Sequence, residues 1–165
     1  MSSNKTNIEK NLIEKAILVS REFDAPLSNV WRAYTESELL EQWWGPSPWR
    51  AETKSFEFRV DGAWLYAMVN PEGEKHWAIM QYTGIEHLVR IDIVDAFCDS
   101  EGVINHTFPK SIGSFNFAKT QTGVLVEFKM CYLNEQDILT LVEMGFEKGI
   151  SIALDQLEKL LHSDL

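Results

Sequence analysis

The sequence of 165 residues has few cysteines and no long apolar run. Cys98 and Cys131 form no C-x-x-C pair, and two thiols cannot make a disulfide framework. The longest uncharged apolar run, from Gly62 to Val69, is far shorter than the ~20 residues that a membrane helix needs. The N-terminal segment MSSNKTNIEKNLIEK contains no apolar core of a secretory signal. We therefore expect a reduced, cytoplasmic protein.

Basic residues are scarce relative to acidic ones. The chain has 15 Lys and Arg against 25 Asp and Glu, which gives a formal net charge of −10. The basic residues also form no cluster along the sequence. Because a phosphate backbone or an anionic membrane surface would repel this charge, we expect neither nucleic acid nor a membrane as a main partner.

The common sequence motifs of catalysis and metal binding are also missing. No H-E-x-x-H or other metal-ligand spacing occurs among the histidines, which are His76, His87, His106 and His162. There is no Gly-rich phosphate loop, no G-x-S-x-G and no Cys/His pair that indicates a nucleophile. We therefore expect no metal and no cofactor, and we assign no catalytic residue.

The composition that remains is typical of one globular domain. Hydrophobic residues make up 45% of the chain and charged residues 24%. A chain of this length folds as one domain that buries a core of its own. No linker or internal repeat divides it, so residues 15–163 are predicted to form a single domain. Residues 1–14 are polar, and we expect them to form a loose tail or a short helix.

Alternation of apolar and polar residues predicts several strands. Residues 16–23 (AILVSREF) predict a first strand, and two short helices follow, one around residues 30–34 and one over 37–44. Between residues 50 and 132 about six further strands are predicted, separated by short turns such as Asp61-Gly62. Strands so close in sequence favour an antiparallel meander.

One long helix is predicted after the strands. Asn134 and Asp137 resemble a capping box, and an apolar face of helical spacing continues to about Leu161. Such a helix has ~27 residues and a length of ~40 Å. Because a sheet with an apolar concave face needs a cover, the sequence predicts an α+β fold in which this helix packs against the sheet.

Two glycines, Gly145 and Gly149, fall on the predicted buried side of that helix. Each costs about 1 kcal/mol relative to alanine in a helix interior, so each needs a reason. They either let the helix approach the sheet closely or leave a cavity between helix and sheet. Only in the second case would Gly149→Ala change ligand affinity more than stability.

Half of the six tryptophans lie within LLEQWWGPSPW, residues 39–49. Trp43, Trp44 and Trp49 either plug one end of the core or line the entrance of a cavity, with Trp43 or Trp44 as the candidate for the entrance. Aromatic walls suit flat or apolar ligands because they offer a large and rigid contact area.

Asp95 is the one acidic residue that the strand pattern directs inward. It continues the parity of Ile91 and Ile93, so its carboxylate points into the concave face unless a bulge turns it outward. A buried carboxylate needs a partner, for which His106, Arg59 or a ligand are candidates. An inward Asp95 with a raised pKa would be an acid/base candidate or a polar anchor.

Three motifs follow one another in residues 21–46. They are F-D-A-P at 23–26, V-W-R-A-Y-T at 30–35 and L-E-Q-W-W-G-P at 40–46. In this order they resemble the opening of the activator of heat-shock-protein-90 ATPase homologue family, which belongs to the START/Bet v-like (SRPBCC) superfamily. Residues 58–73 are similar to its R-x-G-G-x-W hairpin, with Asp61 in place of the first glycine. Residues 144–161 are similar to its closing helix, with Phe146 where tryptophan is common.

This resemblance covers about residues 16–161 and implies a helix-grip fold. Such a fold has a curved antiparallel sheet of about seven strands wrapped around a long C-terminal helix, with two short helices between strands one and two. It also implies a cavity between sheet and helix. Our main hypothesis is therefore that the protein binds a small hydrophobic or aromatic ligand there without catalysis. The candidate cavity residues are Trp31, Trp43, Trp44, Trp64, Tyr66, Met68, Trp77, Tyr82, Asp95, Phe97, Phe115, Phe128, Met130, Gly145, Phe146 and Gly149.

Two alternative functions follow from the same resemblance. The family name implies a chaperone-activator-type interaction domain of the stress response, although a full-length activator carries a further N-terminal domain where this sequence shows only a short tail. Cyclase-like and hydrolase-like members of the superfamily imply a cavity enzyme, for which Asp95, His106 and Tyr66 are candidates. An exposed sheet edge or the Trp-rich segment could also support a homodimer.

Overall fold

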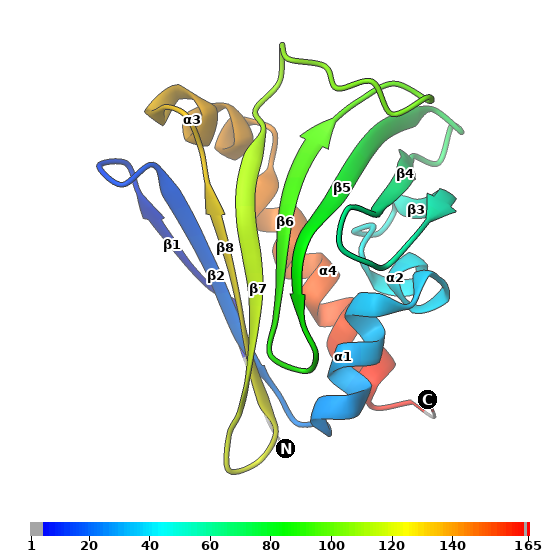
Figure 1. Ribbon diagram of the computed structural model, residues 1–165, viewed down its shortest axis with the longest axis vertical. Coiled ribbons are helices and arrows are strands. Elements are labelled where there is room, and N and C mark those ends of the chain that lie inside the picture. The colour runs from blue at the N-terminus through cyan, green and yellow to red at the C-terminus, as the bar shows by residue number, and fades with distance from the viewer. Residues whose placement is uncertain (1–4, 164) are drawn as a thin grey trace.

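One curved antiparallel sheet forms the framework of the protein (Figure 1). The computed structural model describes residues 5–163 and 165. In this part of the chain, eight strands lie in the order β1-β2-β8-β7-β6-β5-β4-β3. Their bounds are β1 Asn7–Asn11, β2 Ala16–Phe23, β3 Arg50–Phe56, β4 Ala63–Val69, β5 Lys75–Glu86, β6 Arg90–Phe97, β7 Ser111–Lys119 and β8 Val124–Cys131.

The predicted meander accounts for most of this sheet. Each strand from β3 to β8 pairs with the next along the chain, whereas β2 pairs with β8 across the sequence. Alternate residues of β2 and β8 are buried, which is the pattern of strands with one face on the core. Register shifts between Thr53 and Ser55 and between Tyr82 and Gly84 mark bulges, which bend the strands.

The polar N-terminal segment contains a strand and not the loose tail or short helix that we expected. β1 pairs with β2 from Asn7 opposite Ser20 to Asn11 opposite Ala16. Most of its residues are exposed, so the apolar alternation by which a strand is recognised in a sequence is missing. Backbone pairing with β2 defines this strand instead of an apolar pattern of side chains, and the sheet has an eighth strand. Residues 1–4 of the predicted tail lie outside the described residues.

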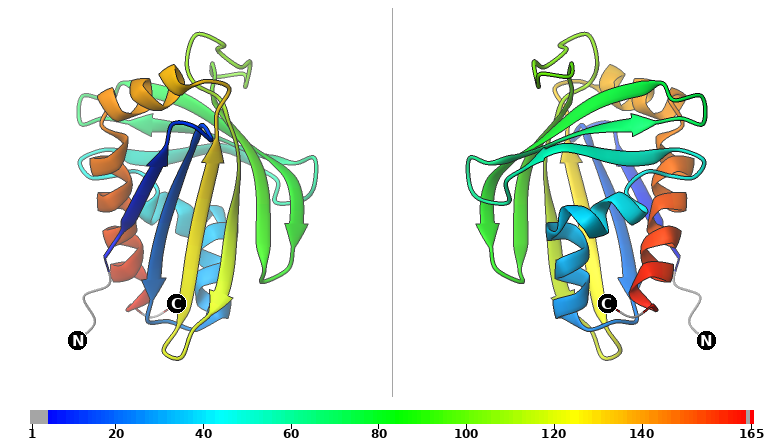
Figure 2. Two further views of the ribbon diagram at one scale, coloured as in Figure 1. Left: turned by 90° about the vertical axis from the view of Figure 1, so that its left-hand side faces the viewer. Right: turned by 90° about the vertical axis from the view of Figure 1, so that its right-hand side faces the viewer.

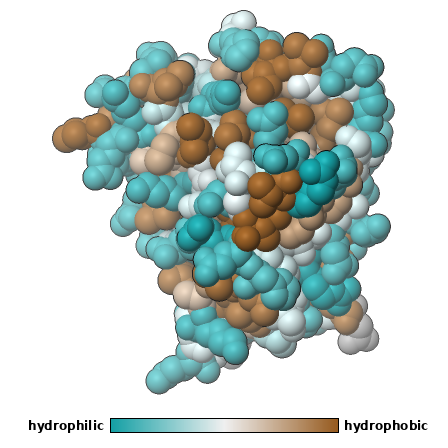
Figure 3. Space-filling view, in the orientation of Figure 1, coloured by the Kyte–Doolittle hydropathy of each residue, from teal (hydrophilic) through white to brown (hydrophobic). Residues whose placement is uncertain are grey.

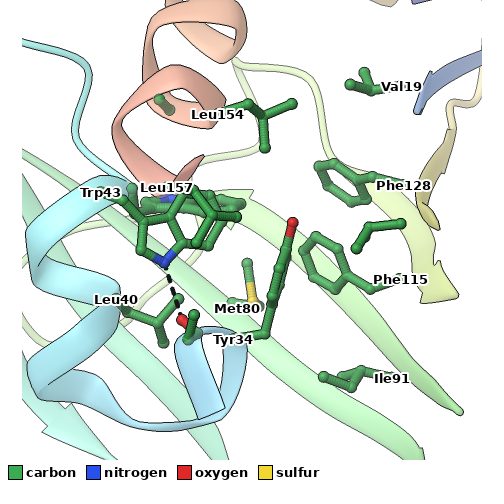
Figure 4. Packing of buried hydrophobic residues seen from close by; sticks show 14 of the residues in the cluster. Val19, Tyr34, Leu40, Trp43, Met80, Ile91, Phe115, Phe128, Leu154 and Leu157 are labelled. Atoms are coloured by element: carbon green, nitrogen blue, oxygen red, sulfur yellow. Dashed lines mark hydrogen bonds between the residues drawn. The ribbon is translucent and has the colours of Figure 1, made fainter. Parts of the chain in front are cut away.

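The two short helices lie where the sequence predicts them. They are α1, Leu27–Thr35, and α2, Ser37–Trp43. Trp43 at the end of α2 is fully buried, and its indole N–H donates a hydrogen bond to the Ala33 carbonyl at 2.9 Å (Figure 4). Beside it, the ring of Tyr34 lies 5.1 Å from that of Phe115. Side chains therefore fill this end of the core, and Trp43 acts as the plug.

The single long helix predicted over 134–161 is in fact two helices. They are α3, Glu135–Glu143, and α4, Phe146–Leu161. Gly145 between them has φ +86°, a left-handed conformation that ends one helix before the next begins. The predicted cap is confirmed, because the Asn134 side chain accepts a hydrogen bond from the Asp137 backbone N–H at 3.0 Å. The prediction failed because the apolar periodicity continues across the break.

Helix α4 lies on the side toward which the sheet curves, and α3 lies at one end of the sheet (Figures 1 and 2). A buried charge joins α4 to β2. The guanidinium of Arg21, whose side chain is only 3% exposed, donates to Asp155 Oδ1 at 2.6 Å and lies 3.3 Å from Glu158 Oε1. This ion cluster fixes the helix to β2, the second strand from one edge of the sheet.

A second connection joins α4 to the segment after α2. The Gln156 side-chain amide donates to the carbonyls of Trp43 at 3.0 Å and Gly45 at 2.8 Å. Its oxygen accepts a hydrogen bond from the Ser47 backbone N–H at 2.9 Å. The Trp-rich segment is thereby held against the helix, which places Trp44 at the edge of the space between helix and sheet.

Candidate functional site

A cavity opens between the concave face of the sheet and the two C-terminal helices. It has a volume of about 390 Å³ and is open to solvent on one side. Its wall takes residues from β4, β5, β6, β7, β8, α3, α4 and the segment that follows α2. A far smaller void, of about 10 Å³, lies deeper in the core around Tyr34 and Trp43. The larger cavity is therefore the space that side chains leave unfilled.

Three aromatic residues give one side of the cavity a fixed shape. The Trp44 indole N–H donates a hydrogen bond to the Tyr66 hydroxyl at 3.0 Å. Tyr66 stacks on Trp64 with ring centroids 4.0 Å apart, and the Trp64 indole N–H donates to Thr53 Oγ1 at 2.9 Å. Because each ring is held by both packing and a hydrogen bond, this part of the wall is formed before any ligand arrives.

Asp95 reaches the cavity from β6, and no bulge turns it away. It lies opposite Met80 on β5 and Ser111 on β7 in an unbroken register. Its Oδ1 is buried and, among the described residues, has no hydrogen-bond partner. Burial raises the pKa of this carboxyl from 3.8 to about 7, because the charged form is poorly solvated there.

Hydroxyl groups surround Asp95 where a counter-charge would be expected. The negative charge of Asp95 and burial together raise the pKa values of Tyr66, Tyr82 and Tyr132, burial being the larger cause for each. Burial and nearby carboxylates also raise the pKa of Cys98 to about 11. These groups stay neutral at physiological pH, so they cannot neutralise the charge of the carboxyl.

Neither protein partner that we predicted for Asp95 reaches it. His106 is exposed in the segment between β6 and β7 and does not line the cavity. Arg59 pairs with Glu57 at 3.2 Å on the surface. Of the three residues suggested for catalysis, the structure thus brings only Asp95 and Tyr66 together. Within residues 5–163 and 165, no group of three or more His, Cys, Asp or Glu side chains is placed to hold a metal.

The cavity mouth combines rigid and flexible side chains. Trp49 and His76 meet edge to face there, with ring centroids 5.3 Å apart. Met144, which is 50% exposed, stands at the break between α3 and α4, and its thioether can adapt to different shapes. The outer face seen in Figure 1 is different in character, because hydrophilic side chains there separate small apolar patches (Figure 3).

The two glycines border the cavity for different reasons. A Cβ at Gly149 would meet only Pro46 Cγ at 3.6 Å, which is an ordinary contact. A Cβ at Gly145 would meet nothing within 4 Å, and there the positive φ explains the glycine. Close approach of helix and sheet therefore explains neither residue, and Gly149 leaves open space beside the mouth.

Most of the predicted candidates do share the cavity wall. They are Trp44, Tyr66, Met68, Asp95, Phe97, Phe128, Met130, Gly145, Phe146 and Gly149. The others lie outside it. Trp64 supports Tyr66 from behind, Phe115 stacks on Phe128 at 4.2 Å, and Tyr82 is buried beyond the wall.

Three tryptophans that we predicted do not reach the wall, for physical reasons. Trp43 is the plug of the core. Trp31 packs against Phe117 under α1, with ring centroids 5.1 Å apart. Trp77 is on the outer face of β5, where Lys54 lies 5.7 Å from its ring centroid. Ala78, the next residue, faces the cavity instead, so the strand parity was the signal that should have excluded Trp77.

The prediction missed wall residues of two kinds. Small residues such as Ala78, Ala96 and Ala153 give little signal in a sequence although they make room for the cavity. The second kind are residues from segments far apart in the sequence, and no local pattern predicts that the fold brings these segments together. The remaining missed residues are Pro46, His76, Pro109, Ser111, Tyr132, Leu141, Met144 and Ile150, whereas Trp49, the less favoured candidate for the entrance, does line the cavity.

Solved structures of bacterial proteins share this fold across nearly their whole length. A protein from Mycobacterium smegmatis has a TM-score of 0.88 at 25% identity, covering 97% of this chain and 98% of its own. One from Arthrobacter aurescens has a TM-score of 0.88 at 26% identity, with 94% and 90% covered. One from Staphylococcus epidermidis has a TM-score of 0.83 at 30% identity, with 96% and 95% covered. Among curated protein sequences, none matches the chain.

The architecture confirms the predicted helix-grip fold of SRPBCC-type proteins. A curved antiparallel sheet, two short helices after its second strand and a C-terminal helix on the concave side are all present. None of the described helices has the length and apolar character needed to cross a membrane. The family model described as "Activator of Hsp90 ATPase homolog 1-like protein" matches residues 24–162, and the chain belongs to that family.

Proposed function

We propose that the protein binds a small apolar or aromatic molecule in the cavity between the sheet and α4, without transforming it. The observation that carries this proposal is an open cavity of about 390 Å³ with a largely apolar and aromatic wall. Pockets for small molecules in proteins have volumes of about 300–1,000 Å³ and are lined mainly by such side chains. The size and lining of this cavity both fall within that description.

The condition of the wall supports binding over a simple packing defect. Hydrogen bonds and stacking already hold Trp44, Tyr66 and Trp64 in place. Ordering these side chains on ligand binding would therefore cost little entropy. The mouth carries Met144, whose flexible side chain can adjust to the occupant. Members of this fold commonly bind hydrophobic ligands, which agrees with the proposal at the level of the fold.

A fluorescent probe with a matched pair of variants tests this function. N-phenyl-1-naphthylamine is uncharged at neutral pH, and its emission increases in apolar surroundings. Gly149→Leu adds a side chain beside the mouth, whereas Lys148→Leu places the same side chain at the exposed neighbouring position. We expect saturable binding to the wild type and to Lys148→Leu, and a loss of affinity of about tenfold or more in Gly149→Leu.

Two results would contradict the proposed function. The first is the absence of saturable probe binding to a wild-type protein that melts cooperatively. The second is equal affinity of the three proteins for the probe, which would place the bound molecule outside the cavity. Thermal melting of both variants checks that a loss of binding in Gly149→Leu does not come from unfolding.

A further inference from the structure

The described wall of the cavity contains one acidic side chain and no lysine or arginine. Among the described residues that line the wall, Asp95 has the only carboxyl group. His76 also lines the cavity but stands exposed at the mouth. The one buried ionisable acid of the cavity is therefore Asp95, and no described residue of the wall supplies a buried positive partner for it.

This carboxyl also lacks a hydrogen-bond partner at one oxygen. Asp95 Oδ1 is buried and accepts no hydrogen bond from any described residue. A buried polar atom without a partner costs stability, and a buried charge costs more. Water can serve this atom while the cavity is open, and a ligand that fills the cavity must replace that water with a donor of its own.

The surroundings of the carboxyl suit a cation more than a neutral acceptor. Ser111 in the wall already offers a hydroxyl donor to an acceptor on a ligand, whereas the Tyr132 hydroxyl donates to Met130 Sδ at 3.4 Å. Positive charge is what the wall lacks. Aromatic rings, among them Trp44, Tyr66 and Phe128, also line the cavity, and ring faces attract ammonium groups.

We propose that the ligand of this cavity is an apolar or aromatic amine, whose protonated nitrogen donates a hydrogen bond to Asp95 while its hydrocarbon body fills the space below α4. This inference rests on the proposed function and specifies its ligand class. Asp95 is then a specificity-determining residue that selects a cation over a neutral or anionic molecule of the same shape.

Three naphthalene compounds of nearly equal size and different charge test the inference. They are 2-(2-naphthyl)ethylamine, 2-(2-naphthyl)ethanol and 2-naphthylacetate. Their affinities are measured by displacement of N-phenyl-1-naphthylamine at pH 8, where the alkylamine is protonated. We expect the wild type to bind the amine about tenfold more tightly than the alcohol, and the acetate least tightly of the three.

Two variants separate a contact with Asp95 from the general effect of negative charge. Asp95→Asn should lower the affinity for the amine about tenfold and leave the affinity for the alcohol within about twofold. Asp92→Asn removes the same charge from the same strand, where Asp92 pairs with Arg90 at 3.0 Å outside the cavity. This control should leave all three affinities unchanged.

Each contrary result has its own meaning. If the probe and the alcohol bind to the wild type but the amine is not preferred, or if Asp95→Asn preserves the preference, the amine inference is wrong and the proposed function stands. Preference for the acetate would also overturn the inference, because Asp95 would then act as a neutral hydrogen-bond donor. If neither the probe nor any naphthalene compound binds, the proposed function fails and the inference fails with it.

Discussion

At the scale of single residues, Asp95 makes stability depend on pH. Its pKa of about 7 in the folded protein lies above the ordinary value of 3.8, so between these values the folded state holds a proton that the unfolded chain has released. The stabilisation by the neutral carboxyl is complete below pH 3.8 and is lost as the pH rises through 7. Asp95→Asn removes this dependence, because an amide does not titrate.

The resulting prediction concerns the difference between the two proteins. From pH 5 to pH 8, the free energy of unfolding of the wild type should fall by roughly 2.5 kcal/mol relative to Asp95→Asn. Urea unfolding of both proteins at the two pH values measures this change. A difference that stays constant with pH would show that the Asp95 carboxyl is not buried as the structure describes.

Alanine substitutions at Gly145 and Gly149 should change the free energy of unfolding in opposite directions. Gly145 has φ +86°, so Gly145→Ala should lower the free energy of unfolding by about 1 kcal/mol or more. At Gly149 a Cβ has room, and Gly149→Ala should raise it by up to about 1 kcal/mol through helix propensity. Thermal melts of the two variants compare them directly, and destabilisation by Gly149→Ala would revive the close-packing explanation.

At the scale of elements, the attachment of α4 to β2 depends on one buried charge. Arg21 is 4% exposed, while its partners Asp155 and Glu158 are more accessible on the helix. Replacing both acids, in Asp155→Asn with Glu158→Gln, leaves the buried guanidinium without a counter-charge. We expect this double variant to lose roughly 3 kcal/mol or more of stability in urea unfolding.

Arg21→Met is the matched control for this attachment. It removes the buried charge and keeps an apolar side chain of similar length, so it should cost clearly less than the double variant. Equal losses in the two proteins would mean that α4 is held by packing around Arg21 and not by its ion pairs.

The sequence predicted elements well wherever one face of an element meets the core. β2, β8 and the two short helices show this, because burial imposes a period on the chain. β1 escaped prediction since an edge strand with mostly exposed side chains has no such period. The break at Gly145 was not predicted because the apolar period continues through it. One residue in a left-handed conformation separates the two helices there.

At the scale of the whole molecule, the existence of the cavity was easier to predict than its wall. The family resemblance implied a cavity between sheet and helix, whereas the glycines left close packing and a cavity as alternatives. Which side chains border it depends on the strand parity that turns Trp77 outward and on the segment that brings Trp49 to His76. The parity of Asp95 was readable from the sequence, but the lack of a partner for its carboxyl was visible only in the fold.

The central claim is that this cavity holds a small molecule, and the native mass of the freshly purified protein tests it most directly. We predict an additional mass on the wild type that disappears on denaturation and is much reduced in Gly149→Leu, while Lys148→Leu retains it. A native mass equal to the denatured mass, both as purified and after incubation with N-phenyl-1-naphthylamine, would contradict the claim.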